Sequence, residues 1–505
     1  MAGVSPSPTS SELPPSSLGW FLLLLGLYVG AHVGLRLALS RVVAIDDARE
    51  ALFSQTFQVG YLPRQPPLYN WLAWAGVRVL GVSAAALIVC RYLTLGVAYL
   101  FLYLSAVRVL GSRRLALLAA FSLLLMGPFN WDVHEELTHS LAALAAAAAT
   151  FYAMLRVERS GHPLAYVGLG TALAAGFLAK FSYGFFAGSL FLAALSTPAY
   201  RRRVLSPRIA LALVTAIVLC VPYALWFIHR ELSIVHMFVE EVRPESAVGY
   251  LGGVARGFGH LGRMLGIYLM PFALVFPIVF WRAWPRRSGD GGEARRLVGN
   301  LLLIELGLVV LGIVAGSLTF LKFRWLMPAF CLVPLLAFAW IDRTALDRRM
   351  MRRYAVALAI AEAVVILGLS LNVFRGDALG APTRLNAPYD LVARTLAEAG
   401  FARGTIAAGD GPLAGNLRLH FPDSRVVRLT NPDYMPPGTG DGQCLVVWEE
   451  PLGNPSALLA WVRTSLEADV EGEPVRSVSV RFHHARARPL RVGYVLLPGG
   501  RGTCR

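Results

Sequence analysis

Apolar stretches long enough to cross a membrane recur along most of this chain of 505 residues. A helix needs about 20 consecutive apolar residues to cross the roughly 30 Å of bilayer hydrocarbon. The composition agrees, because only 15% of the residues are charged, against about 25% in soluble domains. We therefore expect an α-helical membrane protein with about eleven transmembrane helices. They are predicted at roughly 18–40, 83–107, 114–129, 137–156, 163–179, 181–198, 207–228, 259–281, 297–316, 325–341 and 354–374.

The net charge of +16 could indicate a nucleic-acid-binding protein, but its distribution along the chain argues against this. Arginine clusters fall in every second loop between the apolar stretches, at 108–114, 156–159, 201–208, 282–296 and 343–353. Loops rich in Arg and Lys stay in the cytoplasm. This alternation predicts a protein of the bacterial inner membrane with a cytoplasmic N-terminus. Residues 1–17 are rich in Ser and Pro and are expected to form a disordered cytoplasmic tail rather than a cleaved signal peptide.

The pattern changes at about residue 375, where short helical and strand-like segments begin to alternate. Such alternation indicates a small α/β domain, here at 375–505 on the external side of the transmembrane domain at 18–374. Cys444 and Cys504 both lie in this domain, where a disulfide is permitted. Sequence spacing alone leaves open whether the two cysteines pair.

Two adjacent carboxylates, Asp46 and Asp47, directly follow the first apolar stretch, at the start of an external loop at 41–82. The loop is predicted to hold a helix at 46–58, a Pro-rich turn and an aromatic interfacial helix at 68–80. Acidic residues at a helix start are commonly solvated caps. A carboxylate in this position can also take the proton of an attacking hydroxyl group, and the two interpretations are compatible.

Cations near the external membrane edge are candidates for binding a phosphate group. The chain has only two lysines, Lys180 and Lys322, and both map to that edge. An ammonium group is a compact partner for phosphate, although long cationic side chains also extend to the interface simply to reach water. The same two interpretations apply to three arginines, Arg64, Arg91 and Arg324.

The second external loop, at about 128–140, contains further acidic and imidazole side chains. Glu136 and His139 stand at the start of the following helix, as substrate-binding residues or as helix caps. The visible residues require no cofactor. Three acidic residues of this loop leave a divalent cation open as an alternative: Asp132, Glu135 and Glu136.

These residues resemble the GT-C superfamily of polyprenyl-phosphate-sugar glycosyltransferases, especially its protein O-mannosyltransferase and lipid A aminoarabinose transferase branch. That branch has an acidic pair after the first helix and then a Pro-Pro-Leu-Tyr-x-Trp segment. This chain has Asp46-Asp47 followed by Gly60-Tyr61 and Gln65-Pro66-Pro67-Leu68-Tyr69-Asn70-Trp71. Segments 137–140 and 322–328 are similar to two later motifs of the branch.

The resemblance implies transfer of a sugar from a polyprenyl-phosphate carrier to an envelope lipid, glycan or protein, with inversion, on the external face. It implies that Asp46 is the catalytic carboxylate and Asp47 its support. Gln65 replaces the branch's usual Lys, so contact with the carrier is expected to pass to Arg64 or Lys322, with Tyr69 nearby in the motif. The alternatives are a transporter or flippase of lipid-linked saccharides, or another lipid-carrier-dependent transferase of the envelope, such as an O-antigen ligase or a phosphoethanolamine transferase.

Overall fold

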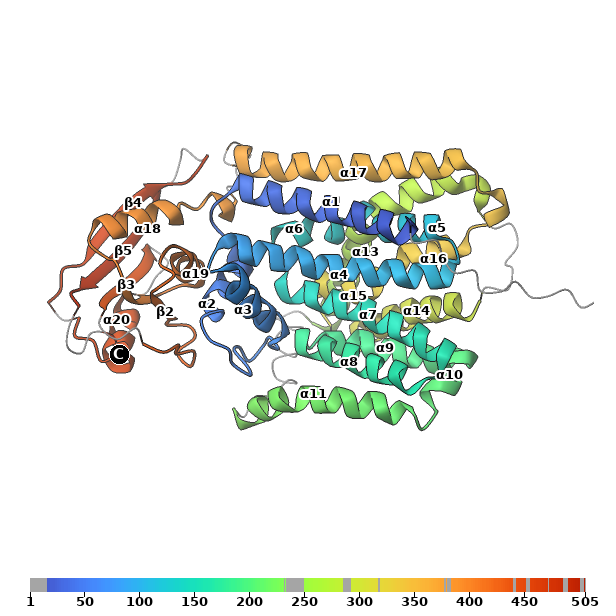
Figure 1. Ribbon diagram of the computed structural model, residues 1–505, viewed down its shortest axis with the longest axis horizontal. Coiled ribbons are helices and arrows are strands. Elements are labelled where there is room, and N and C mark those ends of the chain that lie inside the picture. The colour runs from blue at the N-terminus through green and yellow to red at the C-terminus, as the bar shows by residue number, and fades with distance from the viewer. Residues whose placement is uncertain are drawn as a thin grey trace, which may run out of the picture.

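A helical bundle and a small sheet domain stand end to end in the computed structural model (Figure 1). The structure describes residues 16–230, 232, 249–284, 292–316, 318–376, 378, 383–438, 442–450, 455–470, 472–484, 489–499 and 504. The tail predicted at 1–17 therefore lies outside the described residues, apart from the first residues of α1.

Long apolar helices make up the bundle. They are α1 (Ser16–Leu39), α4 (Ala84–Leu110), α5 (Arg113–Phe121), α7 (Thr138–Ser160), α8 (Pro163–Ala179), α9 (Tyr183–Ser196), α10 (Pro198–Val204), α11 (Ile209–His229), α13 (Tyr250–Phe280), α14 (Glu293–Val314), α15 (Met327–Phe330), α16 (Val333–Trp340) and α17 (Arg348–Arg375). Short 3-10 turns are η1 (Ser122–Leu125), η3 (Trp281–Ala283), η4 (Phe323–Trp325), η5 (Arg343–Ala345) and η6 (Arg384–Asn386), and η2 (Pro128–Asp132) is a π-helical turn.

Each of the apolar stretches predicted from the sequence coincides with one of these helices or with a short run of them. In the described part of the chain, 7 helices are long and apolar enough to span a membrane. One further candidate, Arg113–Leu125 followed by Pro128–Glu135, is bent by 87°, and α8, α9 and the segment Met327–Trp340 are shorter. The expected number of about eleven crossings therefore stays a prediction, although the helices themselves are present.

The predicted arginine clusters gather at one end of the bundle. Figure 1 shows α5 and α10, which carry Arg113–Arg114 and Arg201–Arg203, at the end away from the sheet domain. The same end contains the start of α17, where Arg348 begins the helix. This separation agrees with the alternation of basic loops in the sequence.

The external loop contains two helices, α2 (Ile45–Phe53) and α3 (Leu68–Leu80), at the junction of bundle and sheet domain (Figure 1). The prediction for α3 is confirmed at both ends. The prediction that the first helix continues to residue 58 is wrong, because α2 ends at Phe53. Beyond Phe53, the Gln55 side chain forms hydrogen bonds with the sheet domain, and the chain leaves the helical conformation.

The C-terminal domain is built on a five-stranded sheet with the order β2-β1-β3-β5-β4. β1 (Gly404–Ala408) pairs in parallel with β2 (Arg425–Arg428) and β3 (Gln443–Glu450), and β5 (Pro489–Leu497) pairs antiparallel with β3 and β4 (Arg476–Arg481). Helices α18 (Tyr389–Glu398) and α19 (Gly411–His420) cover one face, and α20 (Pro455–Ser465) packs on the other. The predicted α/β domain is thus present.

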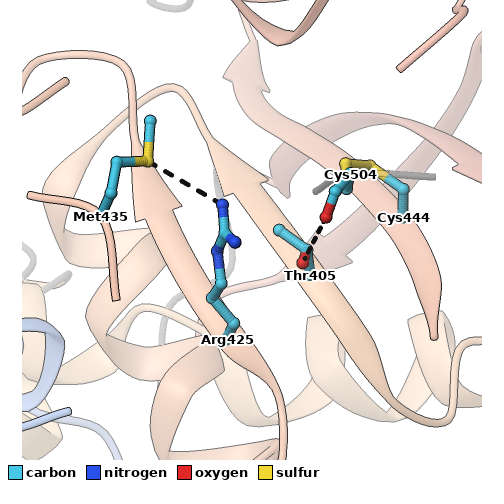
Figure 2. Close-up of a disulfide and its surroundings, with 5 residues drawn as sticks. All are labelled: Thr405, Arg425, Met435, Cys444 and Cys504. Carbon is cyan, nitrogen blue, oxygen red and sulfur yellow. Dashed lines mark hydrogen bonds between the residues drawn. A yellow bond between two sulfur atoms is a disulfide. The ribbon is translucent and has the colours of Figure 1, made fainter. Parts of the chain in front are cut away.

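The disulfide left open by the sequence is present between Cys444 in β3 and Cys504 near the end of the chain (Figure 2). The two Cα atoms are 5.6 Å apart, within the range that a disulfide spans. Thr405 Oγ1 donates a hydrogen bond of 3.2 Å to the carbonyl oxygen of Cys504. This contact and the disulfide together tie the last segment of the chain to β1 and β3.

The external loop and the sheet domain share one hydrophobic core. Val42, Phe53 and Tyr61 of the loop are buried together with α18, α19 and the sheet. Asn416 of α19 accepts from Val43 N at 2.9 Å and donates to Val43 O at 3.1 Å. The sheet domain therefore holds the residues directly before the acidic helix α2 through hydrogen bonds and shared core packing.

Candidate active site

Asp47 forms a buried ion pair in the interior of the protein. Its Oδ2 atom accepts a hydrogen bond of 3.0 Å from Arg91 Nη1 on α4, and the two side chains are 1% and 0% exposed. Arg91 Nη1 also donates to the carbonyl oxygen of Glu135 at 3.3 Å. The snorkelling interpretation of Arg91 is therefore wrong, because the guanidinium group points into the protein rather than to water.

Asp46 lies on the more open side of the same helix turn, with its side chain 15% exposed. Its Oδ2 atom accepts a hydrogen bond of 3.2 Å from Leu137 N. The interpretation of Asp46 and Asp47 as helix caps is wrong. Ala44 occupies the N-cap position of α2, and no side chain forms a capping hydrogen bond there. Leu137 has a φ of 93°, a strained conformation for a branched side chain that is typical of functional sites.

Glu50 extends the acidic face of α2 by one turn, and no motif in the sequence marks it as a site residue. It is 1% exposed, its Oε2 atom accepts from Asn70 Nδ2 at 2.8 Å, and its Oε1 atom lies 3.2 Å from His139 Nε2. His139 is thus brought into the site by Glu50, and Tyr69 packs beside its ring at a centroid distance of 5.8 Å. A carboxylate buried at this depth requires such partners.

Lys180 lies at the external end of α8, directly after its last residue. Its Nζ atom donates a hydrogen bond of 2.8 Å to Ser140 Oγ, in the first turn of α7. The N-terminus of a long helix carries a partial positive charge and suits an anionic group. Lys180 and the start of α7 therefore form a cationic corner next to His139.

The remaining predicted residues divide into two groups. Gln65 accepts a hydrogen bond of 3.1 Å from Arg49, one turn after Asp46, whereas Arg64 is exposed at the surface. Lys322 and Arg324 come from a different part of the bundle, where Tyr268 donates to Phe323 O and Arg324 acts electrostatically on Asp132. Gln65 is thus bonded to α2, and Lys180 to α7 beside His139, whereas Lys322 stands next to η4.

Glu136 lies within electrostatic range of Asp46 and pairs with Arg384. Arg384 Nη1 lies 3.3 Å from Glu136 Oε1, and the Glu136 side chain is 32% exposed. Partial burial, with the nearby charge of Asp46, raises the pKa of Glu136 above its ordinary value. In the described part of the chain no group of three His, Cys, Asp or Glu side chains is arranged to hold a metal ion, and cofactor independence stays a prediction.

A polar cavity of about 390 Å³ opens next to the acidic loop. Its walls come from α1, α4, α6 (Val133–Glu135), α17 and the segment around η6. Its polar lining residues are His32, Arg36, Tyr92, His134, Glu135, Glu136, Asn372, Thr383 and Arg384.

An apolar groove of about 960 Å³ runs on the other side of α4, between α3, α4, α7 and α8. It extends from Leu68 and Ala142 near the external loop to Arg156 and Leu164 at the opposite ends of α7 and α8. Most of its surface is aliphatic, with Cys90, one residue before Arg91, in its wall.

The structure is a helical membrane bundle with a carboxylate loop at its junction with a small sheet domain, and the comparisons with known proteins assign it to the membrane glycosyltransferases of the GT-C type. Residues 64–226 match the family model described as dolichyl-phosphate-mannose-protein mannosyltransferase. The crystal structures of ArnT from Cupriavidus metallidurans share the fold. The apo form has a TM-score of 0.63 at 16% identity over 95% of this chain and 98% of that one. The form bound to undecaprenyl phosphate has a TM-score of 0.60 at 15% identity over 94% and 98%.

Two relatives identify the family to which the chain belongs. The chain is 30% identical over 454 residues to the lipopolysaccharide core galacturonosyltransferase RgtB of Rhizobium johnstonii, and the match covers 89% of this chain and 92% of RgtB. RgtA of the same organism is 30% identical over 84% of this chain and 86% of its own length. The chain belongs to this family of GT-C glycosyltransferases, and it is a lipid-carrier-dependent transferase of the cell envelope. The transporter alternative is thereby set aside.

Proposed function

We propose that this protein transfers a uronic acid from a polyprenyl-phosphate carrier to the core saccharide of an envelope glycolipid. Both curated relatives are named as lipopolysaccharide core galacturonosyltransferases and align over most of the chain. The observation that carries the catalytic part is the contrast between the two aspartates. Asp47 is committed to Arg91, whereas Asp46 is partly exposed and lies near Glu136, which lines the polar cavity.

In the proposed reaction, the acceptor hydroxyl attacks the anomeric carbon while the bond from that carbon to the phosphate oxygen breaks. The carrier phosphate leaves with the electron pair, and the hydroxyl proton passes to Asp46 as general base. Attack opposite the leaving group inverts the anomeric configuration. Arg91 holds Asp47 next to Asp46 and keeps the acidic turn in place.

The carrier is proposed to lie in the apolar groove, with its phosphate at the external end. The groove is aliphatic over the depth of the bundle and suits a polyprenyl chain. Lys180 and the N-terminus of α7 supply positive charge close to that end, where they stabilise the departing phosphate. The ArnT structure bound to undecaprenyl phosphate supports this class of carrier.

The orientation is proposed from the arginine clusters. They lie at the end of the bundle away from the sheet domain (Figure 1), so the positive-inside rule puts that end in the cytoplasm. The acidic loop and the sheet domain are then outside the bacterial inner membrane. A periplasmic phosphatase fused after residue 205 should be inactive, and one fused after residue 505 should be active. The opposite pattern would contradict the orientation.

The substitution Asp46→Asn tests the catalytic role. It keeps the size of the side chain but removes the base, which contributes typically about 10²–10⁴-fold in rate. Purified protein is incubated with labelled polyprenyl-phosphate galacturonic acid and core glycolipid, and transfer is measured by chromatography of the labelled product. Transfer should be lost while the melting temperature in detergent stays near that of the wild type.

Asp390→Asn is the matched control. Asp390 also lies in the first turn of an external helix, α18, and contacts His483 at 2.7 Å. The Asp390→Asn variant should transfer the sugar at the wild-type rate. Near-normal transfer by Asp46→Asn would contradict the base assignment. Failure of the wild type with uronic-acid donors but success with a neutral-sugar donor would contradict the sugar assignment alone.

A further inference from the structure

The polar cavity between α1, α4, α6 and α17 contains groups that are costly at membrane depth. His32 of α1 is fully buried, and its Nε2 atom lies 2.6 Å from Glu362 Oε1 of α17. The ring of His32 stacks on that of His134 with centroids 3.7 Å apart. Tyr28 and Tyr92 hold His134 through hydrogen bonds of 3.2 and 3.1 Å. Ionisable side chains inside a membrane protein generally mark a functional site.

The backbone around the cavity is irregular as well. The bent pair of segments Arg113–Leu125 and Pro128–Glu135 turns by 87° and ends at the cavity wall. Non-helical backbone at membrane depth is tolerated where it is buried in protein or lines a water-filled space. The second segment of this bent pair thus contributes His134 and Glu135 to the polar lining.

The position of the cavity relative to the groove is the decisive observation. Tyr92 of α4 lines the polar cavity, whereas Cys90 and Leu93 of the same helix line the apolar groove. Arg91 lies between them and holds Asp47. The two spaces thus lie on opposite sides of α4, and the Arg91–Asp47 ion pair extends from the helix between them.

We propose that the polar cavity binds the terminal monosaccharide of the acceptor. This inference rests on the proposed function, in which the carrier occupies the apolar groove. An inverting displacement requires the attacking hydroxyl and the leaving phosphate on opposite sides of the anomeric carbon. With the phosphate at the end of the groove near α3, the attacking hydroxyl comes from the side of the polar cavity, which is lined by Glu136, a neighbour of Asp46.

The lining suits a sugar ring. Glu135, Glu136, Asn372 and Arg384 offer donors and acceptors for hydroxyl groups at the outer part of the cavity. Arg384 is paired with Glu136, and Asn372 Nδ2 donates to Glu135 Oε1 at 3.2 Å. The lining holds two arginines, Arg36 and Arg384, and two glutamates, Glu135 and Glu136, so its formal charges cancel. The cavity is therefore suited to a hydroxylated ring rather than to a second phosphate. Its volume of about 390 Å³ falls within the range of about 300–1,000 Å³ for small-molecule sites.

The inference is tested by a substitution on α17 that fills the cavity with a larger side chain. Leu369 lines the cavity, while Leu371, two residues further along the same helix, faces outward and is 44% exposed. Leu369→Trp should raise the acceptor KM on the order of tenfold or more with the donor KM unchanged, because only acceptor binding is obstructed. Leu371→Trp, the matched control, should leave both KM values unchanged. Asn372→Ala is a second, smaller change that should act in the same direction.

Direct binding separates this inference from the proposed function. Binding of a delipidated core oligosaccharide to the full chain is measured without donor, by thermophoresis in detergent. Wild type and Leu371→Trp should bind, and Leu369→Trp should bind at least about tenfold more weakly. A raised donor KM in Leu369→Trp would assign the cavity to the donor's sugar and overturn the inference, as would unchanged acceptor binding in both Leu369→Trp and Asn372→Ala. Absence of transfer by the wild type, with acceptor binding intact, would contradict only the proposed reaction.

Discussion

Gly415 of α19 lies directly against the backbone of α2, so one added methyl group there should displace the helix that carries Asp46 and Asp47. A Cβ atom at Gly415 would stand 1.9 Å from Ala48 O and 2.4 Å from Ala48 C. Both are backbone atoms, so no side-chain rotation relieves the contact. Ala48 is fully buried and follows Asp47 directly. The substitution Gly415→Ala therefore acts on the aspartates without touching any substrate.

The size of the effect follows from the contact distance. Ordinary van der Waals contact begins at 3.4 Å, so α19 and α2 must separate by about 1.5 Å, and a displacement of about 1 Å can cost on the order of 10²-fold in rate. Overpacking of this kind destabilises by about 1–3 kcal/mol. We expect kcat to fall on the order of 10²-fold in Gly415→Ala, with a modest fall in melting temperature and little change in the donor KM.

The assay is transfer of labelled sugar at saturating donor and acceptor, with melting followed in the same detergent. Gly307→Ala is the matched control, because a Cβ atom there meets nothing within 4 Å, and its kcat should equal that of the wild type. Normal kcat in Gly415→Ala, with a normal melting temperature, would refute the view that the sheet domain positions the acidic helix.

Three further perturbations address the charges. Arg91→Leu leaves Asp47 buried and unpaired, which should cost about 3–5 kcal/mol and lower the melting temperature; an unchanged value would contradict the ion pair. Lys180→Ala should raise the donor KM more than Lys322→Ala does, measured by initial rates, and the reverse order would restore Lys322. Burial raises the pKa of Glu449 to about 7, so this group's stabilisation is greatest below pH about 4.5. It is lost as the pH rises through about 7, and melting of Glu449→Gln should depend less on pH over that range.

Helix bounds can be predicted from the sequence more fully than contacts between distant segments can. Helix α3 is predictable at both ends, because prolines precede it and its aromatic residues keep helical spacing. Helix α2 is predicted too long, because the pairing of Gln55 with Val426 depends on a strand that lies 371 residues further along the chain. Local periodicity contains no information about such a partner.

The site shows the same division. Asp46 and Asp47 can be singled out because two carboxylates at a membrane boundary are unusual. Glu50 cannot, because a glutamate on a short amphipathic helix normally faces water. Only the convergence of α2, α3 and α7 shows that Asn70 and His139 enclose it. Arg91 is recognisable as a cation, but its partner stands 44 residues away.

Burial assigns different roles to the two neighbouring aspartates. Successive residues on a helix point about 100° apart, so Asp46 and Asp47 cannot face the same space. Asp47 turns inward, where the guanidinium group of Arg91 compensates the cost of burying its charge. Asp46 turns toward the external loop, where a backbone N–H from the strained Leu137 takes one oxygen atom. Its second oxygen lies 3.7 Å from Arg49 at the solvent side. Of the pair, Asp46 is therefore the carboxylate that we propose as the base for an acceptor hydroxyl, and Asp47 is the one whose ion pair anchors the helix.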